Sequence, residues 1–223
     1  MTLLQASSTR NTIRQYLMPR RGDVALLVGA VLIPFTVFVI LAVAVAGKGA
    51  IGWDAAILDL VERHYRQSLS IRLGSALDAG TALAGVTLVA ALVLLLKRGR
   101  RREALFCILA VGGVLALDVP LKEAFQRPQW SPPGYDTRGV GYVFPSGHAM
   151  ATMALLASMT LISTPRLAKL LLIVGVPLVV AVGVVLVYSW WHYPSDVVAG
   201  WCLAVSWVAA LCLAIRPKPG LSP

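Results

Sequence analysis

Charged side chains are scarce in this chain, because Asp, Glu, Lys and Arg together make up 13% of its 223 residues. That is about half of the fraction typical of soluble domains. Hydrophobic residues make up 58%, and the mean hydropathy is +0.77. This composition excludes a disordered chain and an ordinary soluble domain. It predicts an integral membrane protein.

Cysteine and acidic residues are also few. Cys107, Cys202 and Cys212 lie in apolar stretches, and their odd number excludes a disulfide framework. Ten acidic residues against twenty basic ones give a net charge of +10. In a soluble chain this excess would suggest nucleic acid, but basic residues of membrane proteins collect on the cytoplasmic side. We therefore expect no nucleic-acid partner.

Six apolar stretches are long enough to be interpreted as spans, each needing about 20 mostly apolar residues. The predicted spans are 24–46, 73–96, 104–119, 149–162, 170–188 and 197–215. They predict an all-α, polytopic membrane protein with six transmembrane helices. No internal repeat is present, so we expect one membrane domain over 24–215 between the tails 1–23 and 216–223.

A short amphipathic helix is expected between the first two spans. Trp53, Ile57 and Leu60 recur there at helical spacing, while Asp54 and Asp59 take the polar positions. The pattern fits a helix lying in the membrane interface and equally a loop helix packed on the bundle.

The basic residues are distributed unevenly over alternate segments. Thirteen basic and two acidic residues fall in the two tails and in the loops after the second and fourth spans, whereas the other segments hold seven basic and eight acidic residues. By the positive-inside rule, both termini are expected in the cytoplasm of a bacterial inner membrane. The segments around 122–145 and 190–196 are then expected outside. Aromatic residues should mark that outer interface: Trp53, Trp130, Trp190, Trp191 and Tyr193.

Three outward segments, LKEAFQRPQW, VFPSGHAM and WWHYPSDVVAG, contain the candidate functional residues. These residues are Lys122, Arg127, Ser146, Gly147, His148, His192 and Asp196. Ser146 and Gly147 begin a helix, where free backbone N–H groups and the helix dipole suit a phosphate. Asp196 is placed to accept an N–H from His192, which leaves the other ring nitrogen as a nucleophile or base.

In this order, the three segments resemble the type 2 phosphatidate phosphatase superfamily, which includes lipid phosphate phosphatases and vanadium haloperoxidases. The resemblance implies that His192 attacks phosphorus and forms a phosphohistidine, that Asp196 orients it, and that His148 protonates the leaving oxygen. Other groups would hold phosphate oxygens: Lys122, Ser146 and the Gly147 backbone. The resemblance implies no metal and no cofactor. The expected substrate is a membrane lipid phosphate or pyrophosphate, such as undecaprenyl pyrophosphate.

Two arginines of the family pattern are replaced in this chain, by Gln129 and Leu186. Arg127 is expected to bind phosphate in their place, with Arg138 as a second candidate. A smaller number of cations suits a phosphodiester, which carries less charge than a monoester. A lipid-linked phosphotransferase or phosphodiester enzyme with the same core is therefore an alternative function, and an inactive family member is another.

Two further alternatives come from other classes of protein. His148, His192 and Asp196 could form a non-haem iron site, although Lys122 and Arg127 would repel the cation. A small transporter is the other alternative, but the six spans lack repeat symmetry and the polar residues cluster at one face. The sequence predicts no oligomeric state.

Overall fold

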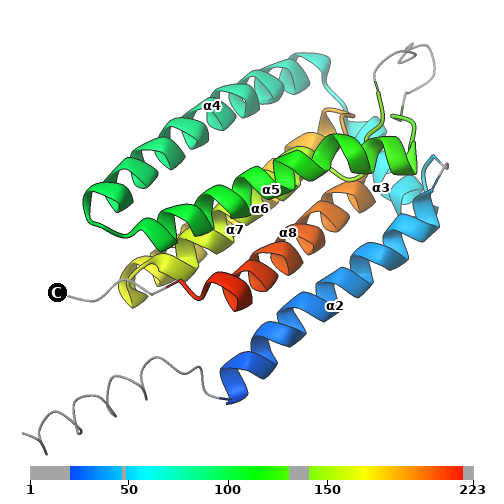
Figure 1. Ribbon diagram of the computed structural model, residues 1–223. Helices are drawn as coiled ribbons and strands as arrows, with labels where there is room; N and C mark the ends of the chain where they lie inside the picture. Colours follow the sequence, from blue (N-terminus) through cyan, green and yellow to red (C-terminus); the bar gives the residue numbers. More distant parts are fainter. Residues whose placement is uncertain (1–20, 47–48, 131–140, 218–223) are drawn as a thin grey trace, which may run out of the picture.

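Seven helices and no strand make up the part of the chain that the computed structural model describes, residues 21–46, 49–130 and 141–217 (Figure 1). The helices are α2 (Arg21–Val45), α3 (Gly52–His64), α4 (Gln67–Lys97), α5 (Arg101–Phe125), α6 (Gly147–Ile162), α7 (Pro165–Tyr188) and α8 (Pro194–Ile215). The predicted all-α fold is confirmed. Arg138 and most of the two predicted tails lie outside the described residues.

Five of these helices are long and apolar enough to cross a membrane: α2, α4, α5, α7 and α8. Their exposed surfaces carry large apolar side chains such as Leu26 and Val43, as contact with lipid tails requires. The sixth predicted span, α6, is a shorter apolar helix of 16 residues. At 1.5 Å per residue it is about 24 Å long, slightly less than a typical hydrocarbon core.

Several helices extend beyond their predicted bounds, and α7 begins at Pro165 rather than at residue 170. α4 begins at Gln67 rather than at residue 73, and α5 continues through Pro120 to Phe125 rather than ending near residue 119. Proline removes one backbone donor, which α5 tolerates within its last two turns. Lys122 therefore lies on a helix and not in a loop.

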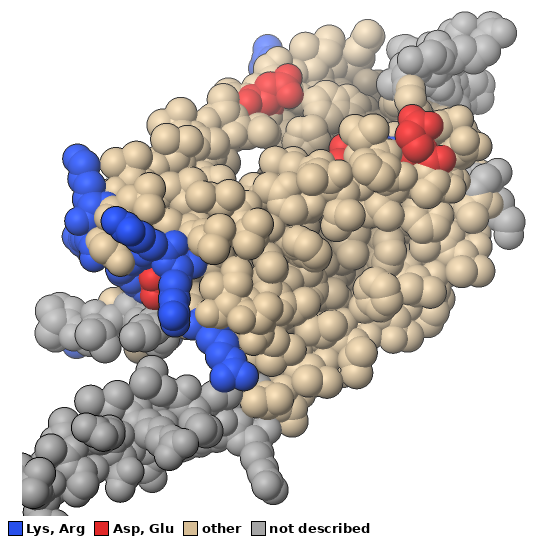
Figure 2. All heavy atoms as spheres, in the orientation of Figure 1, with Lys and Arg blue, Asp and Glu red and all other residues tan. Residues whose placement is uncertain are grey.

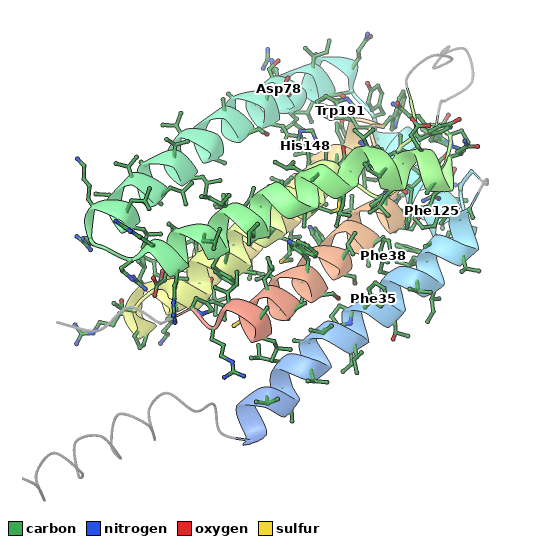
Figure 3. The ribbon with its side chains drawn as sticks, in the orientation of Figure 1. Phe35, Phe38, Asp78, Phe125, His148 and Trp191 are labelled. Carbon is green, nitrogen blue, oxygen red and sulfur yellow. The ribbon has the colours of Figure 1, made fainter. Side chains whose placement is uncertain are left out.

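The main core lies between α2, α5, α6 and α8. Phe38 of α2 stacks on Phe144 with ring centroids 5.9 Å apart, and Phe125 of α5 meets both rings edge-on. Figure 3 shows Phe38 and Phe125 facing one another across the gap between α2 and α5. This aromatic cluster fixes the end of α5 next to the segment that leads into α6.

The amphipathic helix α3 packs on the bundle, contacting α7 and α8. Its inward face buries Leu58 and Asp54, whereas Trp53 and Leu60 stay exposed. Asp54, which takes a polar position in the amphipathic pattern, is therefore buried rather than solvated. The helix forms as its period predicts, but its buried side includes a carboxylate whose partners come from other parts of the chain.

The two ends of the bundle differ in charge. Figure 2 shows Lys and Arg side chains gathered at the end where α4 turns into α5, and acidic side chains near the opposite end. The sequence KRGRRR lies in that turn, from Lys97 to Arg102. The three polar segments singled out in the sequence lie at the other end, away from this basic cluster (Figure 1).

Candidate active site

The start of α6 and the start of α8 meet directly. The Ser146 hydroxyl caps α6 by accepting the Ala149 N–H at 3.4 Å, and the Ser146 N–H donates to the Asp196 carbonyl at 3.1 Å. Pro194 opens α8, and Asp196 in its first turn accepts the Tyr193 N–H at 2.9 Å. Two helix N-termini, with their free N–H groups and dipoles, are thereby brought to one place.

Gly200 permits this close approach of α6 and α8. A Cβ atom at Gly200 would lie 2.8 Å from the Ser146 carbonyl oxygen and 3.1 Å from the Ala149 Cβ atom. The nearer neighbour is backbone, so it cannot move aside without shifting the start of α6. The geometry of the site therefore depends on the absence of a side chain at this position.

Gly200→Ala should destabilise the protein by about 1 to 3 kcal/mol, because it overpacks a helix crossing. A lower midpoint of thermal unfolding in detergent would be the measured effect. Gly112→Ala is the matched control, since a Cβ there meets nothing within 4 Å. Equal unfolding midpoints for the two variants would contradict the packing argument.

His192 and Asp196 lie together, as their spacing predicts. The Nδ1 atom of His192 is 3.6 Å from Oδ2 of Asp196, and both side chains are buried. This separation is slightly longer than a hydrogen bond, so the contact tightens only with a small movement of the ring. With Nδ1 turned toward the carboxylate, Nε2 is the nitrogen free to react.

His148 lies in the first turn of α6 and is half-buried. It is within electrostatic reach of His192 and Lys122, and also of two carboxylates, Asp78 and Asp118. Figure 3 shows His148 and Trp191 on the side of the bundle that faces Asp78 of α4. The two predicted catalytic histidines are therefore neighbours, although His148 lies in α6 and His192 in the turn between α7 and α8.

Lys122 is paired with a carboxylate that is not among the predicted site residues. Its Nζ atom is 3.0 Å from Oδ2 of Asp118, one turn earlier on α5. A Cβ atom at Gly147 would lie 2.7 Å from Oδ1 of Asp118, so this carboxylate presses against the start of α6. The i,i+4 spacing would have revealed the pair if the helix had been extended through Pro120.

Arg127 is fully buried, which does not agree with its predicted role as a phosphate ligand. Its guanidinium donates to Oδ2 of Asp54 at 2.7 Å, to the Ser195 hydroxyl at 2.7 Å and to the Gly49 carbonyl at 2.9 Å. It also donates to Oδ1 of Asp196. The guanidinium is therefore already paired with two carboxylates, and a role for Arg127 in binding phosphate stays a prediction.

Tyr193 covers the same guanidinium instead of marking the membrane interface. Its ring centroid lies 3.9 Å from Cζ of Arg127, and the side chain is 2% exposed. Burial raises the pKa of the Tyr193 phenol to about 12, with the neighbouring carboxylates adding to the rise and Arg127 opposing it. Tyr193 therefore keeps its phenol proton and lines the site in cation–π contact with Arg127.

The two positions where the family arginines are replaced have structural roles. Gln129 donates from Nε2 to the Trp190 carbonyl at 3.0 Å. Trp190 in turn stacks on Tyr65 with ring centroids 3.8 Å apart. Leu186 is fully buried in an apolar cluster under the site. Neither position supplies a cation.

Among residues 21–46, 49–130 and 141–217, no group of three His, Cys, Asp or Glu side chains is arranged to hold a metal ion. Asp54 and Ser195 are site neighbours that the sequence did not reveal. They are 141 positions apart, and no local pattern links them.

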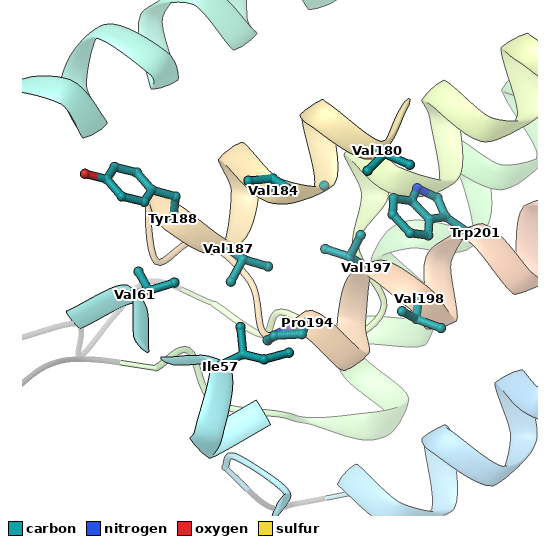
Figure 4. A pocket seen from close by; sticks show the side chains of 11 residues that line it. Ile57, Val61, Val180, Val184, Val187, Tyr188, Pro194, Val197, Val198 and Trp201 are labelled. Atoms are coloured by element: carbon teal, nitrogen blue, oxygen red, sulfur yellow. The ribbon is translucent and has the colours of Figure 1, made fainter. Parts of the chain in front are cut away.

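An apolar cleft of about 260 Å³ lies beside the site, between α3, α7 and α8. Figure 4 shows Ile57, Val187 and Trp201 among the side chains that line it. Pro194 and Val197 also line it, and they flank Ser195 and Asp196 along α8. The cleft and the polar site therefore share the first turn of α8.

Comparison with known proteins places this geometry in a family. The fold is similar to the crystal structure of a transmembrane PAP2 type phosphatidylglycerolphosphate phosphatase from Bacillus subtilis, with a TM-score of 0.61 and 21% sequence identity. The similarity covers 84% of this chain and 94% of that one. A search of curated proteins gave no match. A family model of the PAP2 superfamily matches residues 103–219, just over half of the chain and the whole of the region from α6 to α8. The chain belongs to the PAP2 superfamily.

Proposed function

We propose that this protein is a membrane lipid phosphatase that works through a phosphohistidine on His192. The observation that carries the proposal is the buried Asp196 facing Nδ1 of His192 at 3.6 Å, where two helix N-termini meet. The carboxylate holds the imidazole in one orientation and stabilises the positive charge that develops on it. Nε2 of His192 is then the attacking atom.

The reaction proceeds in two displacements at phosphorus. Nε2 of His192 forms a bond to phosphorus while the bond to the leaving oxygen breaks, and His148 donates a proton to that oxygen. His148 then accepts a proton from water, which attacks the phosphohistidine and releases inorganic phosphate. The Ser146 hydroxyl, the Gly147 backbone N–H and the ammonium of Lys122 hold the phosphate oxygens. No metal is needed for either step.

The apolar cleft beside the site supports a lipid as the substrate. It has room for part of an acyl or prenyl chain, and its lining side chains are apolar. Pro194 and Val197 of the cleft flank Asp196 along α8, so the cleft adjoins the helix turn that orients His192. This arrangement matches a molecule with an anionic headgroup and a hydrocarbon tail.

The charge distribution supports a site at the outer face of a bacterial inner membrane. The cluster of Lys and Arg between α4 and α5 lies at one end of the bundle (Figure 2), and His148 lies toward the other end (Figure 3). The positive-inside rule assigns the basic end to the cytoplasm, together with both termini. The headgroup would then enter from the periplasmic side.

A phosphodiester or a lipid-linked phosphotransfer is the second candidate reaction. Within the described ranges, both cations at the site face carboxylates: Lys122 pairs with Asp118, and Arg127 lies between Asp54 and Asp196. A site with so little excess positive charge favours a singly charged diester over a monoester. The same histidines would then transfer the phosphoryl group to a second lipid instead of to water.

Purified protein should be assayed with phosphatidate, phosphatidylglycerol phosphate, undecaprenyl pyrophosphate and a phospholipid diester, with and without EDTA. We expect release of inorganic phosphate from at least one monoester or pyrophosphate, unchanged by EDTA. Transfer to a second lipid without phosphate release would instead favour the second candidate. Loss of activity with EDTA would contradict a metal-independent histidine mechanism.

A further inference from the structure

The carboxylate that faces His192 is itself held from the far side. Oδ2 of Asp196 faces His192 and accepts the Tyr193 N–H, whereas Oδ1 accepts a hydrogen bond from the Arg127 guanidinium. Both side chains of this ion pair are fully buried. The orientation of Asp196 is therefore set by Arg127 as much as by its own helix.

Arg127 is in turn held by Asp54, which comes from α3. Oδ2 of Asp54 accepts hydrogen bonds from Arg127 Nη2 at 2.7 Å and from the Ser195 hydroxyl at 2.6 Å. Oδ1 of Asp54 accepts the Ser195 N–H at 2.9 Å, in the first turn of α8. One carboxylate of α3 thus binds both the cation and the helix N-terminus that carries Asp196.

We propose that Asp54 and Arg127 are positioning residues, which fix Asp196 and through it the imidazole of His192. The inference rests on the proposed function, because it assumes that His192 is the nucleophile. It gives α3 a role in the reaction, although α3 lies outside the region matched by the family model. The active site is complete only when α3 is docked on α8.

Because this network is buried, its side chains have little freedom to change position or partner. The side chains of Asp54, Arg127, Ser195 and Asp196 are all fully buried, so water does not screen the charges or replace a lost partner. One guanidinium between two carboxylates, with the Tyr193 ring over it, leaves few alternative arrangements. A displaced Asp196 would move the attacking nitrogen, and a misplacement of about 1 Å costs about 10²-fold in rate.

The experiment compares Asp54→Asn, Arg127→Lys and the double variant in the purified full-length protein. Turnover of one lipid phosphate is measured over a range of concentrations and divided by the amount of phosphoenzyme formed in the first turnover, so that misfolded protein does not count. Asp59→Asn is the matched control, because Asp59 pairs with Arg63 on the exposed side of α3.

We expect both single variants to lower kcat by about 10 to 100-fold while KM stays within about 2-fold of wild type. The loss of kcat in the double variant should be no larger than that in the more impaired single variant, because both substitutions break the same chain of contacts. Asp59→Asn should keep the wild-type kcat. Ser195→Ala, which removes only the hydroxyl between Arg127 and Asp54, should give a smaller loss of kcat.

Three results would overturn the inference. They are a wild-type kcat in Asp54→Asn, a raised KM with normal kcat in Arg127→Lys, and additive losses in the double variant. The second result would mean that Arg127 binds the phosphate itself. If the proposed function is wrong, the His192→Ala variant will still release phosphate from the lipid. If His192→Ala is inactive, the results for the Asp54 and Arg127 variants test the positioning roles alone.

Discussion

Replacing His192 with alanine should lower phosphate release by at least about 10⁴-fold, to near the uncatalysed background. The substitution removes the atom that bonds to phosphorus, and no other described group at the site can take its place in covalent catalysis. His148 is near, but in our mechanism it protonates the leaving oxygen. The measurement is the initial rate of phosphate release by purified protein in detergent.

His64→Ala is the control for this prediction. His64 is the remaining histidine of the chain. It lies exposed at the end of α3, where its Nδ1 contacts the Leu60 carbonyl at 2.9 Å. This variant should keep wild-type activity, which excludes a general effect of histidine loss. If His192→Ala released phosphate at more than a hundredth of the wild-type rate, water rather than His192 would be the nucleophile.

Replacing His148 with alanine should have an effect that depends on the leaving group. With an alkyl phosphate such as phosphatidate, the departing alkoxide needs a proton, so we expect a loss of about 10² to 10⁴-fold in kcat. With p-nitrophenyl phosphate the departing phenolate is a weak base and needs no proton, so the loss in the first step should be much smaller. The ratio of the two losses is the quantity to measure.

His192→Ala provides the comparison for this ratio, because loss of a nucleophile should impair both substrates alike. Equal losses for the two substrates in His148→Ala would contradict the role of His148 as the general acid. In that case Lys122, paired with Asp118 at 3.0 Å on the neighbouring helix, would be the next donor to test.

The helices could be predicted because hydropathy and helix-capping residues are local features of the sequence. The long apolar stretches predicted the C-terminal ends of α2, α7 and α8 to within one residue, and Ser146 marks the start of α6 as an N-cap. The larger errors arose at Gln67, Pro120 and Pro165. Polar residues at the start of α4 and a proline within α5 look like helix boundaries in sequence, but contacts with the bundle extend both helices past them.

The site could be predicted only where its contacts are local. His192 lies just before α8 and Asp196 lies in its first turn, four positions later, so the spacing alone brings them together. Arg127 and Asp54 are 73 positions apart, and nothing near either residue indicates the other. Arg127 was therefore expected to bind the ligand, because the sequence shows a cation beside an anion site but not the carboxylates that occupy it.

The contacts made at the two replaced family positions are also non-local and could not be predicted from the sequence. Gln129 and Leu186 could be recognised in sequence as missing cations, but their structural roles depend on the packing of the turn before α8. Asp118 was visible only as a polar residue near the end of a span. Its contact with Gly147 arises because α5 and α6 are packed side by side.

The formation of a covalent phosphoenzyme on His192 is the most direct test of the mechanism. Wild-type protein would be mixed with a ³²P-labelled lipid phosphate, quenched within one turnover, and its bound phosphate located by acid and base stability and by peptide mapping. We expect acid-labile, base-stable phosphate on the peptide that contains His192, and none in His192→Ala. Turnover at the normal rate without protein-bound phosphate at any time point, or with phosphate bound to another residue, would contradict it.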